Sequence, residues 1–215
     1  MTQHSSAPKV RPMQWWARRI RVPLGFVMAA VFLIVTAFRS PHDLAIAWSL
    51  ALVLPGLFLR AAASGTVKKN RELTVTGPYA YTRNPLYLGS ALIAAGFALA
   101  LFSWIVALVI AVGFAAIYIP VIASEEQFLR ATFPGFDEYC RQVPRFLPRL
   151  TPAKPHANNS LQSDWTPVTS DAPGGFSLVL YRKHREYNAA LGAALLYLGL
   201  LFLHSMLRFV EHGVW

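Results

Sequence analysis

The chain has little charge for its length. Asp, Glu, Lys and Arg make up 14% of its 215 residues, whereas hydrophobic residues make up 55%. A soluble domain carries roughly 25% charged residues, so this composition excludes an ordinary soluble domain. The few charges are also segregated between long apolar stretches, which is typical of an integral membrane protein.

Cysteine and metal-binding patterns are equally scarce. The single Cys140 excludes an intramolecular disulfide and a multi-cysteine metal site. The six histidines show no metal-ligand spacing, so no metal site is predicted. The net charge of +10 comes without a helix-turn-helix, a zinc finger or an aromatic-basic RNA strip, and we expect no nucleic-acid partner. The basic residues flank apolar spans instead, where they attract anionic lipid head groups.

Five apolar stretches predict an all-α, polytopic membrane protein with about five transmembrane helices. They cover residues 22–38, 44–63, 86–101, 105–123 and 189–210. All Lys and Arg except Arg39 and Arg208 then fall on one side of the membrane. The positive-inside rule places that side, together with the amino terminus, in the cytosol and the carboxyl terminus outside.

Prolines and small residues distinguish particular spans. Pro55 and Pro120 lie inside the second and fourth spans, which we expect to be kinked or locally unwound at these positions. In the third span, small residues recur at a spacing of four and offer a close-packing face to a neighbouring helix. These residues are Ser90, Ala94, Ala98, Ala91 and Ala95.

The polar stretches divide the chain into five parts. A basic amino-terminal segment, residues 1–21, precedes two spans in residues 22–65. Residues 66–150 hold the densest motifs and a helical hairpin, residues 151–175 form a linker rich in Pro, Asn, Ser and Gly, and residues 176–215 add a basic segment and a last span. We expect the fourth span to continue as a helix beyond the membrane to about Thr132, where Phe133-Pro134-Gly135 ends it.

The most informative motif is GPYAYTRNPLYLG, residues 77–89. Pro85 fixes the backbone at the start of the third span and biases Asn84 toward an extended conformation. Arg83 is therefore free to direct its planar fork of donors toward a carboxylate or phosphate at head-group level. A snorkelling arginine within an aromatic belt is the simpler interpretation of the same residue types. The aromatic residues concerned are Tyr79, Tyr81 and Tyr87.

An acidic pair, Glu125-Glu126, follows Tyr87 after 37 residues that are nearly all apolar. Half of that stretch is a helix of about 28 Å, close to the ~30 Å of a bilayer core, so it predicts a hairpin that returns to the same face. A glutamate at this boundary is a functional candidate by default, and a solvated helix extension is the alternative. We expect Tyr139 and Arg145 to close the resulting site from the cytosolic side.

Together these elements resemble the isoprenylcysteine carboxyl methyltransferase and phospholipid methyltransferase superfamily of membrane enzymes. That family combines a Gly-x-Tyr strip, Arg-His-Pro-x-Tyr-x-Gly, a helical hairpin, a Glu-Glu pair and a Phe-Gly-x-x-Tyr tail that ends in proline. The corresponding residues here are Gly77-Pro78-Tyr79, 83–89, Glu125-Glu126 and 133–144. The resemblance covers about residues 66–150. Asn84 departs from it by replacing the histidine, and Pro134 departs from it as an insertion in the Phe-Gly step.

The resemblance implies an S-adenosylmethionine-dependent methyltransferase. Glutamate accepts hydrogen bonds from the cofactor's ammonium or ribose, arginine pairs with a carboxylate, and tyrosine faces attract the sulfonium. Arg83 and Glu126 take the catalytic roles in this prediction, although Arg83 would orient the acceptor instead if the acceptor is a carboxylate. The residues expected to bind the cofactor are Tyr79, Arg83, Asn84, Pro85, Tyr87, Glu125, Glu126 and Tyr139.

The acceptor is expected to be lipophilic, such as a prenylated cysteine carboxylate or a lipid, and to enter from the bilayer at the cytosolic face. A bacterial inner membrane is the expected location. Two rival functions remain open. One is an NADPH-dependent membrane reductase of the sterol-reductase type, whose tail is similar around Tyr139-Cys140-Arg141. The other is a non-catalytic lipid-binding or assembly protein, which the departure at Asn84 leaves open.

Overall fold

The computed structural model describes residues 29–38, 43–68, 73–153 and 175–212. This part of the chain is all-helical and contains no strand, so the all-α expectation is confirmed for it. The elements are a short helix at Ala29–Phe38, α2 (Asp43–Thr66), the 3-10 helix η1 (Gly77–Ala80), α3 (Pro85–Ala100), α4 (Trp104–Thr132), α5 (Phe136–Gln142), α6 (Leu178–Lys183) and α7 (Tyr187–His212).

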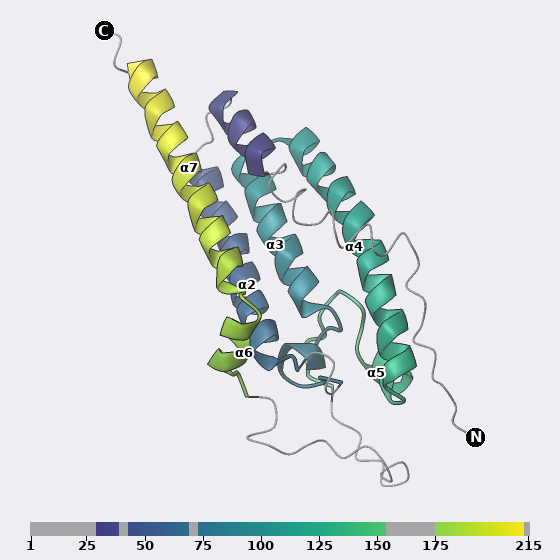
Figure 1. Ribbon diagram of the computed structural model, residues 1–215. Helices are drawn as coiled ribbons and strands as arrows, with labels where there is room; N and C mark the ends of the chain where they lie inside the picture. Colours follow the sequence, from purple (N-terminus) through teal and green to yellow (C-terminus); the bar gives the residue numbers. More distant parts are fainter. Residues whose placement is uncertain (1–28, 39–42, 69–72, 154–174, 213–215) are drawn as a thin grey trace, which may run out of the picture.

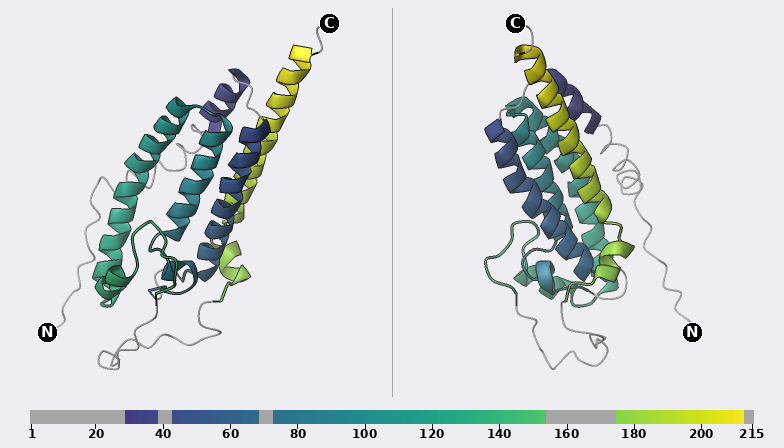
Figure 2. Two further views of the ribbon diagram at one scale, coloured as in Figure 1. Left: turned by 180° about the vertical axis from the view of Figure 1, so that it is seen from behind. Right: turned by 90° about the vertical axis from the view of Figure 1, so that its left-hand side faces the viewer.

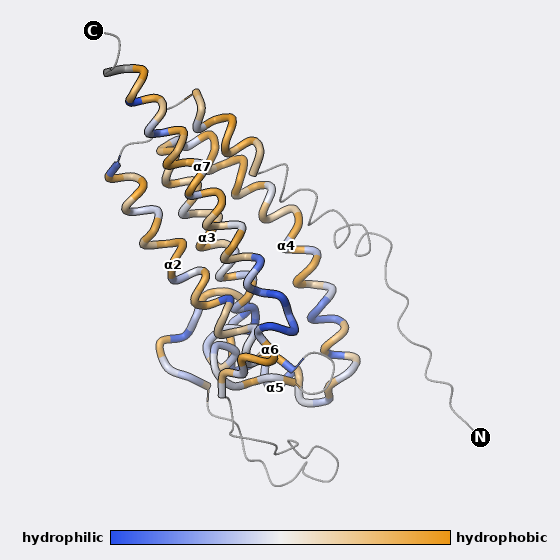
Figure 3. Tube along the Cα trace, turned by 60° about the vertical axis from the view of Figure 1, so that its left-hand side comes forward, coloured by the Kyte–Doolittle hydropathy of each residue, from blue (hydrophilic) through white to orange (hydrophobic). Residues whose placement is uncertain are grey.

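The long helices α2, α3, α4 and α7 run side by side, and the short elements η1, α5 and α6 gather at one end of this bundle (Figures 1 and 2). Most of the hydrophilic residues concentrate at the same end, which we call the polar end (Figure 3). The helix Ala29–Phe38 lies at the opposite end of the bundle. The molecule is therefore polar at one end and apolar along most of its length.

Among the described residues, three helices are long and apolar enough to cross a membrane: α2, α4 and the Tyr187–Val210 part of α7. Their outward faces expose large apolar side chains such as Phe58, Trp104 and Phe209, which water would not favour but lipid does. The helices α3 and Ala29–Phe38 are apolar but shorter. Each expected span thus falls on a helix, although residues 22–28 lie outside the described residues. The count of five spans and the cytosolic amino terminus stay predictions.

The prolines inside α2 and α4 do not interrupt them. Both helices continue without a break through Pro55 and Pro120. Local unwinding is therefore not found at either position, and the alternative, a kink, stays a prediction. A proline inside a helix removes one backbone donor, and the remaining hydrogen bonds of a helix of 24 or 29 residues hold the turns on either side together.

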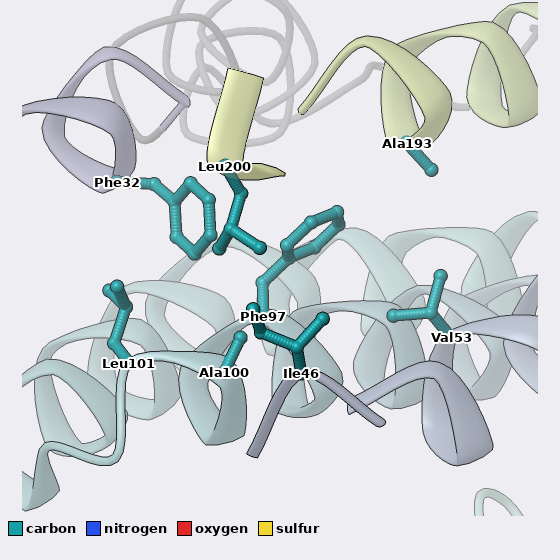
Figure 4. Packing of buried hydrophobic residues seen from close by; sticks show 8 residues of the cluster. All are labelled: Phe32, Ile46, Val53, Phe97, Ala100, Leu101, Ala193 and Leu200. Carbon is teal, nitrogen blue, oxygen red and sulfur yellow. The ribbon is translucent and has the colours of Figure 1, made fainter. Parts of the chain in front are cut away.

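A hydrophobic cluster holds helix Ala29–Phe38, α2, α3 and α7 together (Figure 4). Phe97 lies at its centre, with its ring edge-on to Phe32 at 5.1 Å and its centroid 5.0 Å from that of Tyr197. Such aromatic pairs contribute about 0.5–1.5 kcal/mol each beyond the area that they bury. The hydroxyls of Tyr197 and Ser49 are also hydrogen-bonded at 2.5 Å, which links α7 to α2. These contacts attach the last helix to the rest of the bundle.

Glycines form the close contact between α2 and α3. A Cβ on Gly56 would lie 2.8 Å from the carbonyl oxygen of Gly89, and a Cβ on Gly89 would lie 2.7 Å from that of Gly56. Gly96 meets the Ser49 carbonyl in the same way. Of the small residues expected to pack closely, Ser90 contacts Arg60 of α2, whereas the four alanines line a groove toward α4. The closest backbone approach to α2 is made by the glycines, which the expected face did not include.

The fourth span continues past the acidic pair, as expected. Helix α4 ends at Thr132, and the Phe133 amide donates to the Leu129 carbonyl at 2.8 Å to close its last turn. After Pro134-Gly135 the chain enters α5, where Phe136, Tyr139 and Val143 form a second buried cluster. This cluster packs beneath the end of α4 and completes the polar end.

Candidate active site

A pocket of about 710 Å³ opens at the polar end, among the ends of α2, α3 and α4, helix α5 and the turn before α7. This volume lies within the range of about 300–1,000 Å³ that is typical of small-molecule sites. All the residues expected to bind a cofactor line it: Tyr79, Arg83, Asn84, Pro85, Tyr87, Glu125, Glu126 and Tyr139. The helical hairpin therefore brings the arginine strip and the acidic pair into one cavity.

Local backbone features place the strip of residues 77–89. Gly77 adopts a φ of +59°, a left-handed conformation that favours glycine, where the chain turns into η1. Pro85 stands in the first turn of α3, where its missing amide hydrogen costs nothing. The Arg83 amide donates to the Pro144 carbonyl at 2.9 Å. This bond fixes the strip against residues 143–149, the segment that follows α5 and that we call the tail.

Glu126 is the centre of a buried ion cluster with Arg83 and Arg145, which we call the Glu126 cluster. Arg83 Nη1 lies 3.1 Å from Glu126 Oε1. Arg145 donates from Nε to Oε1 at 3.0 Å and from Nη2 to Oε2 at 2.5 Å, a two-pronged pairing. The Glu126 side chain is only 8% exposed, whereas that of Arg145 is 58% exposed. Glu126 thus ties α4 to both the strip and the tail.

Arg83 has a second partner on α5. Its Nη1 donates to the Sγ of Cys140 at 2.7 Å. Burial raises the pKa of the Cys140 thiol, and the nearby Arg83 charge partly opposes this shift. The Nε of Arg83 is buried without a partner among the described residues, so this guanidinium retains one unused donor beside the pocket.

Glu125 points to the other side of the pocket. Its Oε1 accepts a hydrogen bond from the Tyr87 hydroxyl at 2.8 Å. The Tyr87 ring in turn stacks edge-on against Tyr118 of α4, with centroids 5.1 Å apart. The two adjacent glutamates therefore have different surroundings, because one is held by two arginines and the other by a phenol.

Asn84, which stands where the family pattern has histidine, binds the tail. Its Nδ2 donates to the Arg145 carbonyl at 2.8 Å, and its side chain is buried. The neighbouring Thr82 hydroxyl donates to the Phe146 carbonyl at 3.0 Å. The Asn84 amide thus holds the backbone of Arg145, whose side chain is the exposed arginine of the Glu126 cluster.

Two tyrosines form the wall of the pocket at η1 and α5. The Tyr139 hydroxyl donates to the Tyr79 carbonyl at 2.8 Å. Burial is the main cause that raises the pKa of both phenols above the ordinary value. Both side chains therefore stay protonated at neutral pH and act as hydrogen-bond donors or as aromatic faces.

Comparison with known proteins supports the motif. Residues 45–135 match the family model for phospholipid methyltransferase. The match covers less than half of the chain and is a likeness of this segment. The resemblance to the isoprenylcysteine carboxyl methyltransferase and phospholipid methyltransferase superfamily is thereby confirmed. The match and the apolar helices of the described residues are those of a phospholipid methyltransferase-like segment within a protein that has helices able to span a membrane.

Two curated relatives share the segment in part. The cobalt-zinc-cadmium resistance protein CzcN of Cupriavidus metallidurans is 42% identical over 84 residues. The nickel-cobalt-cadmium resistance protein NccN of Alcaligenes xylosoxydans xylosoxydans is 40% identical over 84 residues. Each match covers 39% of this chain and 39% of the relative. No solved structure matches the chain.

The pocket extends beyond the phospholipid methyltransferase segment. Tyr139 follows that segment, and Glu186, in the turn before α7, lines the same cavity from a position still farther along the chain. Glu186 accepts from Arg60 Nη2 at 2.7 Å, and Arg60 lines the cavity from α2. Sequence reasoning missed both residues. Two signals were available: Arg60 is a charged residue inside the apolar stretch 44–63, and Glu186 is an acidic residue directly after the basic residues 182–185.

An apolar groove of about 750 Å³ lies beside the pocket, between α3 and α4. Alanines of α3 form one wall, and residues of α4 such as Trp104, Ile110 and Phe114 form the other. Phe146 lines the groove and also packs against the buried cluster of Tyr87, Val121 and Ile122. Phe146, which follows the phospholipid methyltransferase segment, therefore contacts both the groove and a cluster whose Tyr87 and Val121 line the pocket.

Proposed function

We propose that the protein transfers a methyl group from S-adenosylmethionine to a lipophilic acceptor at the cytosolic face of a bacterial inner membrane. One observation carries this proposal: the strip of residues 77–89 and the Glu125-Glu126 pair line one cavity of about 710 Å³ at the polar end of an apolar bundle. The family match of residues 45–135 supports methyl transfer as the reaction class.

The residues of the pocket fit the cofactor's chemistry. Glu125 uses one of its acceptor sites for Tyr87 and keeps others for an ammonium or a ribose hydroxyl. Arg83 keeps its buried Nε as a donor for a carboxylate. The rings of Tyr79, Tyr87 and Tyr118 offer faces that attract a cationic sulfonium. When bound, S-adenosylmethionine supplies an electrophilic methyl group for an in-line displacement.

The chain's own residues then position and desolvate the reacting groups. Arg145 and Arg83 both pair with the Glu126 carboxylate and hold it in place. Glu126 in turn orients the guanidinium of Arg83, which lines the pocket. Asn84 holds the segment after α5 against the Glu126 cluster through its hydrogen bond to the Arg145 carbonyl. Tyr139 and Tyr79 remain neutral and exclude water from the α5 side.

The groove between α3 and α4 suits the apolar part of the acceptor. Its lining is almost entirely hydrocarbon, and it lies along helices that are apolar enough for the bilayer. An acyl or prenyl chain in this groove would bring its polar end past Phe146 toward the pocket. This route supports a lateral approach from the membrane, whereas the cofactor approaches from the aqueous side.

Calorimetric titration of S-adenosylmethionine into detergent-purified protein tests the proposal. We expect binding to the wild type and a loss of at least tenfold in affinity for Arg83→Ala and Glu126→Gln, since each change removes a charge-assisted interaction. Glu138→Gln is the matched control, because this glutamate of α5 pairs with Arg141 at the surface, outside the pocket. Binding of NADPH but not of S-adenosylmethionine would favour the reductase alternative. Binding of neither by folded protein would favour the non-catalytic one.

A further inference from the structure

Three carboxylates line the pocket, and they differ in how much of their acceptor capacity is used. Glu126 accepts from Arg83 and, with both oxygens, from Arg145. Glu125 accepts one hydrogen bond from Tyr87. Glu186 accepts from Arg60 through Oε2, and within the described residues its Oε1 has no partner. Glu125 and Glu186 therefore keep most of their acceptor sites for a ligand, whereas the two arginines already use both oxygens of Glu126.

The α6–α7 turn holds Glu186 in a fixed position. Arg185, directly before it, adopts a φ of +53°, a left-handed conformation that is strained for a non-glycine residue. His184 Nδ1 lies 2.9 Å from the Ser64 carbonyl oxygen, and the Ser177 amide donates to the Gly65 carbonyl at 2.9 Å. These bonds fasten the turn to the end of α2 and compensate the strained backbone. Glu186 reaches the pocket because of them.

Arg60 fixes the other half of the ion pair. Its Nη1 donates to the Ser90 hydroxyl and lies 3.5 Å from the Leu86 carbonyl oxygen, while Nη2 binds Glu186. The pair is largely buried, with side-chain exposures of 22% for Arg60 and 14% for Glu186. Arg60 thus pairs with the largely buried carboxylate through Oε2 and leaves Oε1 unoccupied at the cavity.

We propose that Glu186 binds the ammonium group of a ligand in this pocket and that Arg60 positions it. An ammonium offers N–H donors with a positive charge, and a buried carboxylate with a spare oxygen binds such donors more strongly than it binds neutral hydroxyls. The inference rests on the proposed function, which supplies two sources for the group: the α-ammonium of S-adenosylmethionine and the amine of a phospholipid head group. In either case a residue outside the family segment completes the site.

Calorimetry on Glu186→Gln distinguishes the two sources, with Glu138→Gln as the control. If the cofactor supplies the ammonium, the variant binds S-adenosylmethionine roughly 10–100-fold more weakly than wild type. Its affinity for 5′-methylthioadenosine, which lacks the amino-acid portion, stays unchanged. If the lipid supplies it, the affinity for dihexanoyl phosphatidylethanolamine falls instead, while that for dihexanoyl phosphatidylglycerol stays the same. A variant that binds all four probes like the wild type overturns the proposal.

A second variant separates binding from folding. Arg60→Met/Glu186→Met removes both buried charges together, so neither is left unpaired, and such a replacement is often neutral for stability. We expect it to fold and still to lose the ammonium-dependent part of binding. If the double variant keeps that part, Glu186 is only a structural residue. A wild type that binds no S-adenosylmethionine would overturn the proposed function, yet the comparison of the two lipids would still test Glu186.

Discussion

Two ion clusters lie at opposite ends of the bundle, and each consists of one carboxylate and two basic side chains. At the polar end, Glu126 holds Arg83 and Arg145. At the other end, Asp43 at the start of α2 lies 2.8 Å from His204 Nε2 and 2.7 Å from Arg208 Nη2, both on α7. The carboxylate is 8% exposed in the first cluster and 65% exposed in the second. The two clusters therefore differ mainly in how much solvent reaches the carboxylate.

The contribution of an ion pair to stability depends on how deeply the pair is buried. Removing one partner from a buried pair leaves an uncompensated charge and costs about 3–5 kcal/mol. An exposed pair competes with water and salt, and its net contribution is small. The Glu126 cluster is accordingly able to fix the shape of a pocket, whereas the Asp43 cluster joins two helix ends that the hydrophobic contacts of Phe97 already hold.

The largest effect is expected for Glu126→Gln. The amide keeps the shape of the side chain but leaves the buried Arg83 without its counter-charge, and we expect a loss of about 3 kcal/mol in the free energy of unfolding. Denaturation in detergent micelles measures it, with Glu138→Gln as the exposed control. Equal stability of the two variants would show that the buried cluster contributes no more than a surface pair.

The next effect separates the two arginines of the cluster. Arg83 is 13% exposed and also binds Cys140, whereas Arg145 is 58% exposed. We expect Arg83→Met to cost about 2 kcal/mol in the free energy of unfolding and Arg145→Met about 1 kcal/mol or less, because water already screens the latter. The same denaturation assay ranks them. The reverse order would mean that the two-pronged geometry of Arg145 outweighs burial.

A smaller effect is expected at Tyr139, beside the buried cluster. Tyr139→Phe removes the hydrogen bond to the Tyr79 carbonyl and should cost about 1 kcal/mol at neutral pH. Burial raises the pKa of the Tyr139 phenol, so the unfolded chain loses this proton first as the pH rises. The stabilising contribution is complete below about pH 10 and declines above it.

Melting temperatures between pH 8 and 11 test this dependence. The wild type should lose stability above about pH 10, and Tyr139→Phe should lose less over the same interval. Buried Tyr79 contributes to the decline in both proteins, so the variant still shows part of it. Parallel curves for the two proteins would contradict the assignment to Tyr139.

The smallest effect is expected at the exposed cluster. Asp43→Asn should leave the melting temperature unchanged at physiological salt and lower it slightly at low ionic strength, since salt screens exposed charges. Glu126→Gln should instead be equally destabilising at both salt concentrations. If Asp43→Asn lowered the melting temperature equally at both salt concentrations, the Asp43 cluster would behave like the buried Glu126 cluster.

Features encoded by neighbouring residues were predictable from the sequence. The end of α4 followed from Phe133-Pro134-Gly135, and the residues of the pocket followed from two short motifs joined by an apolar hairpin. Arg60 and Glu186 were not predictable, because 126 positions separate them and no local pattern announces the pair. The spacing of small residues in α3 could not choose among its faces, since glycines and alanines occur on different sides.

Neighbouring helices of unequal length have a consequence for the surrounding lipid. Helix α3, with 16 residues, measures about 24 Å, and α4, with 29 residues, measures about 44 Å. The hydrocarbon core of a typical bilayer is about 30 Å thick, so α3, as the span that the sequence predicts, is shorter than the core, and we expect the lipid to thin at its start. That start carries Pro85 and Tyr87 of the pocket. The rate of the proposed methyl transfer should therefore depend on acyl-chain length, because thicker membranes resist the deformation that brings head groups down to this depth.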